Sequence, residues 1–149
     1  DYATPRKLLT AVQSILGIKD FVVDLAADET NHVTQRYISK EQDALTVDWS
    51  DFSEGWCWLN PEYKRIGPWV QKAYEDSFAG ANIVVLVPAS VGANWWRDWV
   101  HEKAKVLFLN GRVGFIPDKP KWLYPKDLAL LLYSMRLEAM KDYQVWTWE

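Results

Sequence analysis

The chain has 149 residues, of which 49% are hydrophobic and 25% charged, and its formal net charge is -3. This length and balance predict one globular domain over residues 1–149 with a single buried core. The acidic charge argues against an extended basic surface for nucleic acid, but it is compatible with a local basic patch. The single cysteine, Cys57, excludes an internal disulfide and a cysteine-based zinc site.

Other features of the sequence argue against a membrane span and a metal centre. No apolar run approaches the roughly 18 residues that would predict a membrane span. His32 and His101 have no partners at ligand spacing, so no metal site is expected. Ten tryptophans are unusually many, and most of them are expected in the core. The lone cysteine suits a reducing compartment, which favours a cytoplasmic protein.

The first part of the chain is predicted to contain a helix followed by a buried strand. Thr4 is a suitable N-cap, Pro5 fits the first helical position, and apolar residues recur at helical spacing until Gly17 ends the helix. The apolar run at residues 21–25 indicates a buried parallel strand. The next expected elements are a short helix at residues 31–36 and a short strand at residues 37–38.

Strands then alternate with helices, which favours a parallel sheet covered on both sides. Strands are expected at residues 55–59 and 81–88, with helices at 68–79 and 94–103, the last of them capped by Asn94. After residue 104 the expected elements are a strand at 105–109, a turn at 110–111, a hairpin partner at 112–116, a loop at 117–125, and strands at 128–133 and 144–148. The predicted fold is α/β, with a mostly parallel central sheet, helices on both faces and antiparallel strands toward the C-terminus.

The most informative stretch is Asn60-Pro61-Glu62-Tyr63, directly after an apolar strand. The Asn60 side-chain oxygen can accept one hydrogen of an amine, and a backbone carbonyl at Pro61 can accept the other. Tyr63 can stack on the face of a flat ring. Two acceptors on one amino group orient its nitrogen lone pair toward an electrophile, which is the arrangement needed to methylate an exocyclic amine.

Several segments accompany this motif along the chain. They are Thr4-Pro5, the run from Phe21 to Ala27, Asp43-Ala44-Leu45 with Asp48-Trp49, the run from Val84 to Ala89, Trp95-Trp96, and Gly111-Arg112-Val113. In this order and spacing they resemble the small phage-encoded, Dam-like DNA N6-adenine methyltransferases, and the resemblance covers most of the chain. It implies a Rossmann-like methyltransferase fold, S-adenosyl-L-methionine as cofactor, and DNA as partner.

The resemblance also suggests cofactor-binding residues. Thr4 and Pro5 correspond to positions near the methionine end of the cofactor, although a plain helix cap explains them equally well. Asp24, at the end of the first strand, can hold the cofactor amino group, and the small turn that follows lets a ligand approach the backbone. The turn comprises Leu25, Ala26 and Ala27 and lacks the usual glycines. The alternative is that Asp24 caps the next helix.

A second set of candidates concerns the adenosine part of the cofactor. Asp48 is expected to accept a hydrogen bond from the cofactor adenine amine, with Trp49 against the ring. The alternative is a solvated acidic turn. Glu41 and Asp43 are both candidates for the ribose, and the sequence does not choose between them. Asn60 is also counted among the cofactor-binding residues.

Glu62 departs from the family motif, which usually has a second proline at this position. Three interpretations are open. Glu62 is tolerated because the acceptors come from its neighbours, it adds a negative charge near an amine that becomes cationic, or it rearranges the loop because it restricts the backbone less than proline. The third interpretation would reduce or abolish activity.

The chain offers few candidates for DNA contacts and little length for target recognition. We expect no separate target-recognition domain, and recognition is then either relaxed or shared across a homo-oligomer. DNA contacts are expected from the basic residues Lys64, Arg65, Arg97, Arg112, Lys119 and Lys121.

The sequence therefore predicts methylation of the N6 amine of adenine in DNA, in a bacterial host's cytoplasm, as protection against restriction. The target base is flipped out or single-stranded. The preference for adenine over cytosine rests on the resemblance alone. A second hypothesis is an inactive descendant that binds nucleic acid or protein, and a third is methylation of RNA or a free nucleotide.

Overall fold

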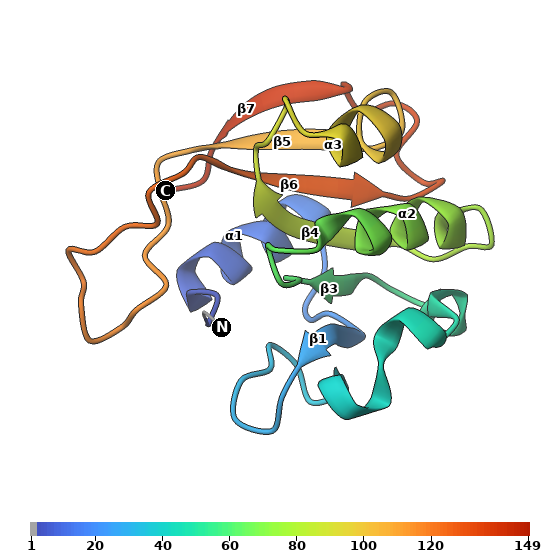
Figure 1. Cartoon of the computed structure of the whole chain (residues 1–149), viewed down its shortest axis with the longest axis horizontal. Coiled ribbons are helices and arrows are strands. Elements are labelled where there is room, and N and C mark those ends of the chain that lie inside the picture. The colour runs from blue at the N-terminus through green and yellow to red at the C-terminus, as the bar shows by residue number, and fades with distance from the viewer. Residues whose placement is uncertain (1–2) are drawn as a thin grey trace.

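The computed structural model describes residues 3–149 and shows one twisted sheet between helices (Figure 1). The helices are α1 (Arg6–Leu16), α2 (Ile66–Ser77) and α3 (Asn94–Trp99), and short 3-10 turns are η1 (Lys40–Gln42), η2 (Ala44–Thr46) and η3 (Trp49–Phe52). The strands are β1 (Val23–Ala27), β2 (Tyr37–Ser39), β3 (Cys57–Leu59), β4 (Ile83–Pro88), β5 (Lys105–Asn110), β6 (Leu128–Tyr133) and β7 (Tyr143–Thr147).

The seven strands lie in the order β2-β1-β3-β4-β6-β5-β7. The β2-β1-β3-β4 half is wholly parallel, and β6 lies antiparallel between β4 and β5. β7 returns parallel to β5, so β6 is the one strand in the described chain that runs against the others. The mixed α/β fold is confirmed, but the expected antiparallel C-terminal region contains one such strand.

Strand β4 shows how the sheet divides the core into two layers. Ile83, Val85 and Val87 face one apolar cluster, and Val84 and Leu86 face the other, because successive side chains point to opposite faces. The first cluster is covered by α2 and α3, and the second by α1. All six β4 residues are buried, as expected for a central strand with helices on both sides.

Helix α1 forms as the sequence indicates, except at its start. Leu8, Leu9 and Val12 are buried on one face, and Gly17 ends the helix with a positive φ of 68°. The N-cap position belongs to Pro5, and Thr4 does not cap the helix as predicted. The Thr4 hydroxyl instead accepts a hydrogen bond from Asn60, so it contacts a distant part of the chain and not the helix backbone.

Two predicted elements are wrong. Residues 31–36 are irregular, with bends at 33–36, because Asp28 Oδ1 accepts hydrogen bonds from the backbone of Thr30 and Asn31, which competes with helical bonding. Residues 112–116 form no hairpin strand, because the fully buried β6 occupies the place beside β5. The predicted helix at 94–103 is also shorter: it ends at Trp99, and Glu102 has a φ of 62° that no right-handed helix continues.

Within residues 3–149, none of the helices combines the length and apolar character that crossing a membrane requires.

Candidate active site

A cleft of about 1050 Å³ opens at the carboxyl ends of β1, β2 and β3. Its walls include the end of β1, the start of η1, the Asn60–Arg65 segment and the end of the β5–β6 loop. In an α/β sheet, the carboxyl ends of parallel strands bring the loops that follow them to one edge, where ligands bind. The cleft is therefore the leading candidate for the active site.

Asn60 presents an unpaired acceptor in this cleft. Its Nδ2 donates to Thr4 Oγ1 at 3.3 Å. Its Oδ1 is buried and has no hydrogen-bond partner among residues 3–149. A buried carbonyl oxygen without a partner is costly, so such an atom in a cleft points to a ligand with a donor. Thr4 lines the cleft with Asn60, whereas Pro5 is not among the lining residues.

Tyr63 lies on the same wall of the cleft. Its hydroxyl is buried and has no hydrogen-bond partner within residues 3–149, and burial raises the pKa of its phenol well above the ordinary value. The Tyr63 ring meets Tyr124 edge-on, with centroids 5.8 Å apart. Pro61 also lines the cleft and is buried. The segment therefore brings an acceptor and an aromatic ring together, as the sequence suggests.

Glu62 also lines the cleft, but more than half of its side chain is exposed to solvent. Its side chain is 56% exposed, and its carboxylate lies 3.8 Å from Lys40 Nζ. Its backbone carbonyl accepts from the amide of Arg65 at 3.3 Å, which closes a turn. With glutamate at this position, the neighbouring Asn60 and Tyr63 still line the cleft.

The end of β1, the strand next to β3, supplies another wall of the cleft. Asp24 is 3% exposed, and its carboxylate accepts from the backbone amides of Ala26 at 3.2 Å and Val33 at 3.0 Å. Burial raises the pKa of Asp24, and these backbone hydrogen bonds oppose the rise. Asp24, Leu25, Ala26 and Ala27 all line the cleft. No helix follows β1 directly, so Asp24 fastens the β1–β2 connection and does not cap a helix.

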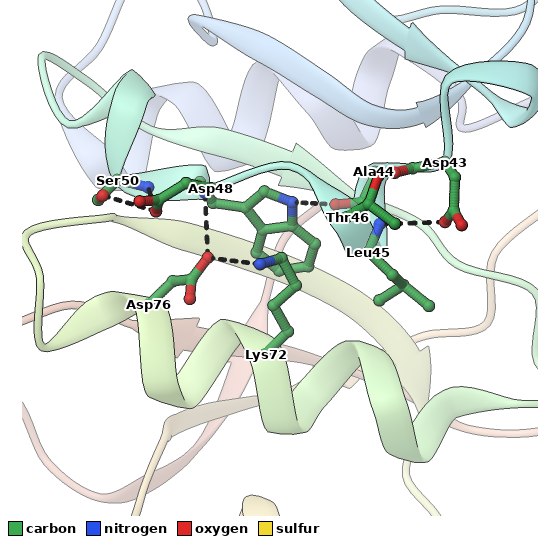
Figure 2. Close-up of polar contacts among 9 residues, drawn as sticks. Asp43, Ala44, Leu45, Thr46, Asp48, Ser50, Lys72 and Asp76 are labelled. Atoms are coloured by element: carbon green, nitrogen blue, oxygen red, sulfur yellow. Dashed lines mark hydrogen bonds and ion pairs between the residues drawn. The ribbon is translucent and has the colours of Figure 1, made fainter.

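The structure does not bring Asp48 or Trp49 to the cleft. The exposed Asp48 carboxylate accepts from the Ser50 amide at 3.0 Å and the Ser50 hydroxyl at 2.6 Å, which caps η3 (Figure 2). Trp49 is fully buried, and its indole N–H donates to the Ala44 carbonyl at 2.9 Å. Neither residue lines the cleft in the observed conformation, and the predicted contact of this pair with the cofactor adenine stays a prediction.

Trp49 instead supports the cleft from behind. Its ring stacks on Trp69 with centroids 6.1 Å apart, and Trp69 lines the cleft. Lys72 lies over the Trp49 ring and pairs with Asp76 at 3.0 Å, so α2 holds this tryptophan in place. The sequence did not indicate a role for Trp69 in the cleft, because this tryptophan looks like any other apolar residue of the predicted helix.

The acidic candidates for the ribose do line the cleft. Both Glu41 and Asp43 are among the lining residues. Asp43 has a φ of 49°, and its carboxylate accepts from the Leu45 amide at 3.3 Å, as Figure 2 shows. With Asp24, they make the β1–η2 side of the cleft acidic.

The predicted DNA-binding residues separate into three groups. Lys64 and Arg65 line the cleft, and their side chains have no ion pair or hydrogen bond within the described part of the chain. Arg97 is engaged by Asp98 at 2.7 Å, and Arg112 lies 3.6 Å from Asp127. Lys119 and Lys121 are exposed on the β5–β6 loop but are not among the lining residues.

Two residues of the cleft come from the same loop and were missed. Tyr124 and Lys126 line the cleft, although they are about 60 positions from Asn60 in the chain. The Tyr124 amide donates to the Val113 carbonyl at 2.8 Å, which folds the loop back on itself. The one signal in the sequence is an aromatic residue between prolines, which is too common to predict a site. Across residues 3–149, no group of three potential metal ligands is present.

Comparisons with known proteins identify the family of the chain. The model of the family described as DNA N-6-adenine-methyltransferase (Dam) matches residues 1–127. A DNA N-6-adenine-methyltransferase of Haemophilus phage HP1 is 32% identical over 117 residues, which cover 77% of this chain and 65% of the relative. A DNA N-6-adenine-methyltransferase of Escherichia phage T1 is 29% identical over 108 residues, which cover 72% of this chain and 44% of the relative.

The aligned region therefore spans less than two thirds of either relative. The family match includes the helix α1, the whole Asn60–Tyr63 motif and the β5–β6 loop that completes the cleft. The chain belongs to the DNA N-6-adenine-methyltransferase (Dam) family.

Proposed function

We propose that the protein methylates the N6 amine of adenine in DNA and takes the methyl group from S-adenosyl-L-methionine. The observation that carries this proposal is the unpaired, buried Asn60 Oδ1 in the cleft. Membership of the Dam family supports the substrate and the cofactor. The names of the phage relatives support the same reaction.

The residues of the cleft fit the cofactor. Its ammonium group suits the Asp24 side, and its ribose hydroxyls suit Glu41 and Asp43. The small side chains of Ala26 and Ala27 leave room for a ligand against the end of β1. When bound, S-adenosyl-L-methionine supplies an electrophilic methyl group on a sulfonium, so no metal is required.

The other side of the cleft suits the target base. Asn60 Oδ1 accepts one hydrogen of the adenine amine, and the Pro61 carbonyl accepts the other. The Tyr63 ring stacks on the base, and Tyr124 lies beside it and limits how the base can tilt. These residues act by alignment and by excluding water, which are the main requirements of this reaction.

Glu62 is compatible with this reaction in our proposal. The acceptors come from Asn60 and Pro61, and the Glu62 carboxylate lies toward solvent beside Lys40. We therefore favour the interpretation in which glutamate is tolerated in place of the usual proline. A negative charge that is 56% exposed is well screened, so it adds little to the stabilisation of a cationic amine.

DNA reaches the cleft from its basic side. Lys64, Arg65 and Lys126 line the cleft, and their side chains make no ion pair within residues 3–149, so they are available for phosphates. A duplex hides the adenine amine, and the base must leave the stack or be single-stranded before it can enter. We propose that the modification protects DNA from restriction in the cytoplasm of a bacterial host.

The direct test is incubation with methyl-labelled S-adenosyl-L-methionine and unmethylated adenine-rich DNA, followed by mass analysis of the nucleosides. N6-methyladenine is the expected product. RNA and free adenosine serve as competitors and should not reduce the yield at equal concentration. Cofactor binding without product on any adenine-containing DNA would contradict the proposal, and so would label found in cytosine alone.

The contrast between unpaired and ion-paired cations makes a separate prediction about DNA affinity. Lys64→Ala is expected to weaken binding to duplex DNA several-fold and to reduce the slope of log K against log salt by about 1, because one phosphate contact is lost. Arg97→Ala is the matched control, since Asp98 already neutralises that guanidinium. Anisotropy titrations at several salt concentrations measure both, and equal effects of the two substitutions would contradict the assignment.

A further inference from the structure

Within residues 3–149, strand β7 forms an edge of the sheet with one free side. Its only strand neighbour is β5, and Figure 1 shows it as the uppermost strand with no element of residues 3–149 beyond it. Residues 143–148 read Tyr-Gln-Val-Trp-Thr-Trp, without a charge or a proline. Edge strands usually carry such residues because a free row of backbone groups pairs with other chains.

The opposite edge of the sheet is handled differently. β2 has only three residues, and it runs directly into η1, where Gln42 Oε1 accepts from the Ser39 amide at 2.8 Å. The edge is therefore short and its end is capped. Within residues 3–149, β7 is therefore the longer of the two edges, and its backbone is free to pair with another strand.

The outer face of β7 is also apolar. Val145 is 71% exposed and Tyr143 is 37% exposed, both on the face that does not pack against α1. Tyr143 stacks on Phe108 of β5 with centroids 6.0 Å apart, which extends the apolar surface inward from the edge. A partner that adds a strand would cover part of this surface as well as the backbone.

The charges that flank β7 identify the partner. Lys141 lies two residues before the strand and Glu149 lies two residues after it, at equal distances from Val145. When two copies of β7 pair antiparallel with Val145 at the centre, Lys141 of each copy faces Glu149 of the other. Tyr143 then faces Thr147 of the other copy, and both lie on the face of Val145 because the side-chain period is two within the strand. The segment is therefore complementary to itself.

We propose that two copies of this chain associate through β7, paired antiparallel about a two-fold axis at Val145, so that their sheets join into one. Such an interface is isologous and closes at two copies. The paired strand is only five residues long, so the dimer is expected to dissociate on the order of micromolar concentrations. This proposal stands independently of the methyltransferase activity.

Cysteine cross-linking tests the register. Val145→Cys is expected to form a covalent dimer under mild oxidation, because directly opposed residues of antiparallel strands lie about 4.5–5.5 Å apart at Cα, within disulfide range. Thr147→Cys is the matched control: its two copies would be displaced by four residues along the strands, roughly 13 Å. The native Cys57 does not interfere, because it is fully buried and burial raises the pKa of its thiol to about 12.

Charge reversal tests the partner. Lys141→Glu alone is expected to raise the dimer dissociation constant about tenfold, because it places like charges opposite each other twice. Adding Glu149→Lys to it restores opposite charges and is expected to restore the dimer. Lys7→Ala controls for the ion pair of Glu149 with Lys7 within the chain, which is 3.1 Å long, and should leave the dimer unchanged.

Sedimentation velocity over a range from low micromolar to near millimolar gives the association state of each variant. A chain that stays monomeric throughout would overturn the proposal. So would equal cross-linking of Val145→Cys and Thr147→Cys, or failure of the double charge reversal to recover association.

Discussion

Replacing Asn60 with alanine is expected to lower the rate of methyl transfer to adenine by about 10²- to 10³-fold, comparable to removal of one preorganised polar group from other active sites. The physical reason is the loss of the Oδ1 acceptor that holds the adenine amine in line with the methyl group. Oδ1 has no partner within residues 3–149, so its removal breaks no existing hydrogen bond. The bond from Asn60 Nδ2 to Thr4 is 3.3 Å long and contributes about 1 kcal/mol or less to the free energy of unfolding.

Single-turnover rates with saturating DNA and cofactor measure this effect without interference from product release. Asn60→Asp keeps an oxygen acceptor and should retain far more activity than Asn60→Ala. Thr4→Val removes only the partner of Nδ2 and should cost less than either. Full activity of Asn60→Ala would show that the acceptor for the adenine amine lies elsewhere. It would also contradict the proposal that the Tyr63 ring stacks on a base held by Asn60.

The elements of the fold that depend on local pattern could be predicted from the sequence. β4 and β6 are continuous apolar runs because both of their faces are buried, and their expected positions agree with the structure to within two residues. The Asn60–Tyr63 motif could be proposed because its chemistry lies in consecutive residues, and these residues line the cleft. The end of β1 also lines the cleft, although its aspartate accepts hydrogen bonds from a loop and caps no helix.

The parts that could not be predicted depend on contacts between distant residues. Tyr124 and Lys126 reach the cleft because the β5–β6 loop folds back on itself. No local pattern in the sequence predicts how this loop folds. Asp48 and Trp49 look like a ligand site in the sequence, but Trp49 is fully buried behind Trp69. The structure is also needed to tell which cations are free to contact DNA. The sequence shows Arg97 next to an aspartate but does not show that the two side chains form an ion pair.

Asp24 is expected to be the other residue of the cleft whose loss has a large effect. Asp24→Ala leaves the backbone amides of Ala26 and Val33 without their acceptor, which is expected to lower the free energy of unfolding by about 2 kcal/mol. It also removes the carboxylate proposed to hold the cofactor ammonium, so cofactor affinity should fall tenfold or more. Quenching of tryptophan fluorescence on titration with S-adenosyl-L-methionine measures the affinity.

Asp48→Ala is the matched control for cofactor binding. It removes an exposed carboxylate that caps η3 outside the cleft, so it should cost about 1 kcal/mol of stability and leave cofactor affinity unchanged. A larger loss of affinity in Asp48→Ala than in Asp24→Ala would contradict the placement of the cofactor. That result would instead favour the sequence-based prediction that Asp48 contacts the adenine of the cofactor.

The loss of stability in Asp24→Ala should depend on pH, and the sign follows from burial. Burial raises the pKa of Asp24 above its ordinary value of 3.8, so between these two values the folded protein binds more protons at this group than the unfolded chain does. The stabilising contribution of Asp24 is therefore complete below about pH 3.8 and declines as the pH rises through the folded pKa. Urea unfolding from pH 4 to 8 should show the difference between wild type and Asp24→Ala shrinking with rising pH. A difference that grows over this range would mean that the two backbone hydrogen bonds outweigh burial in setting the pKa of Asp24.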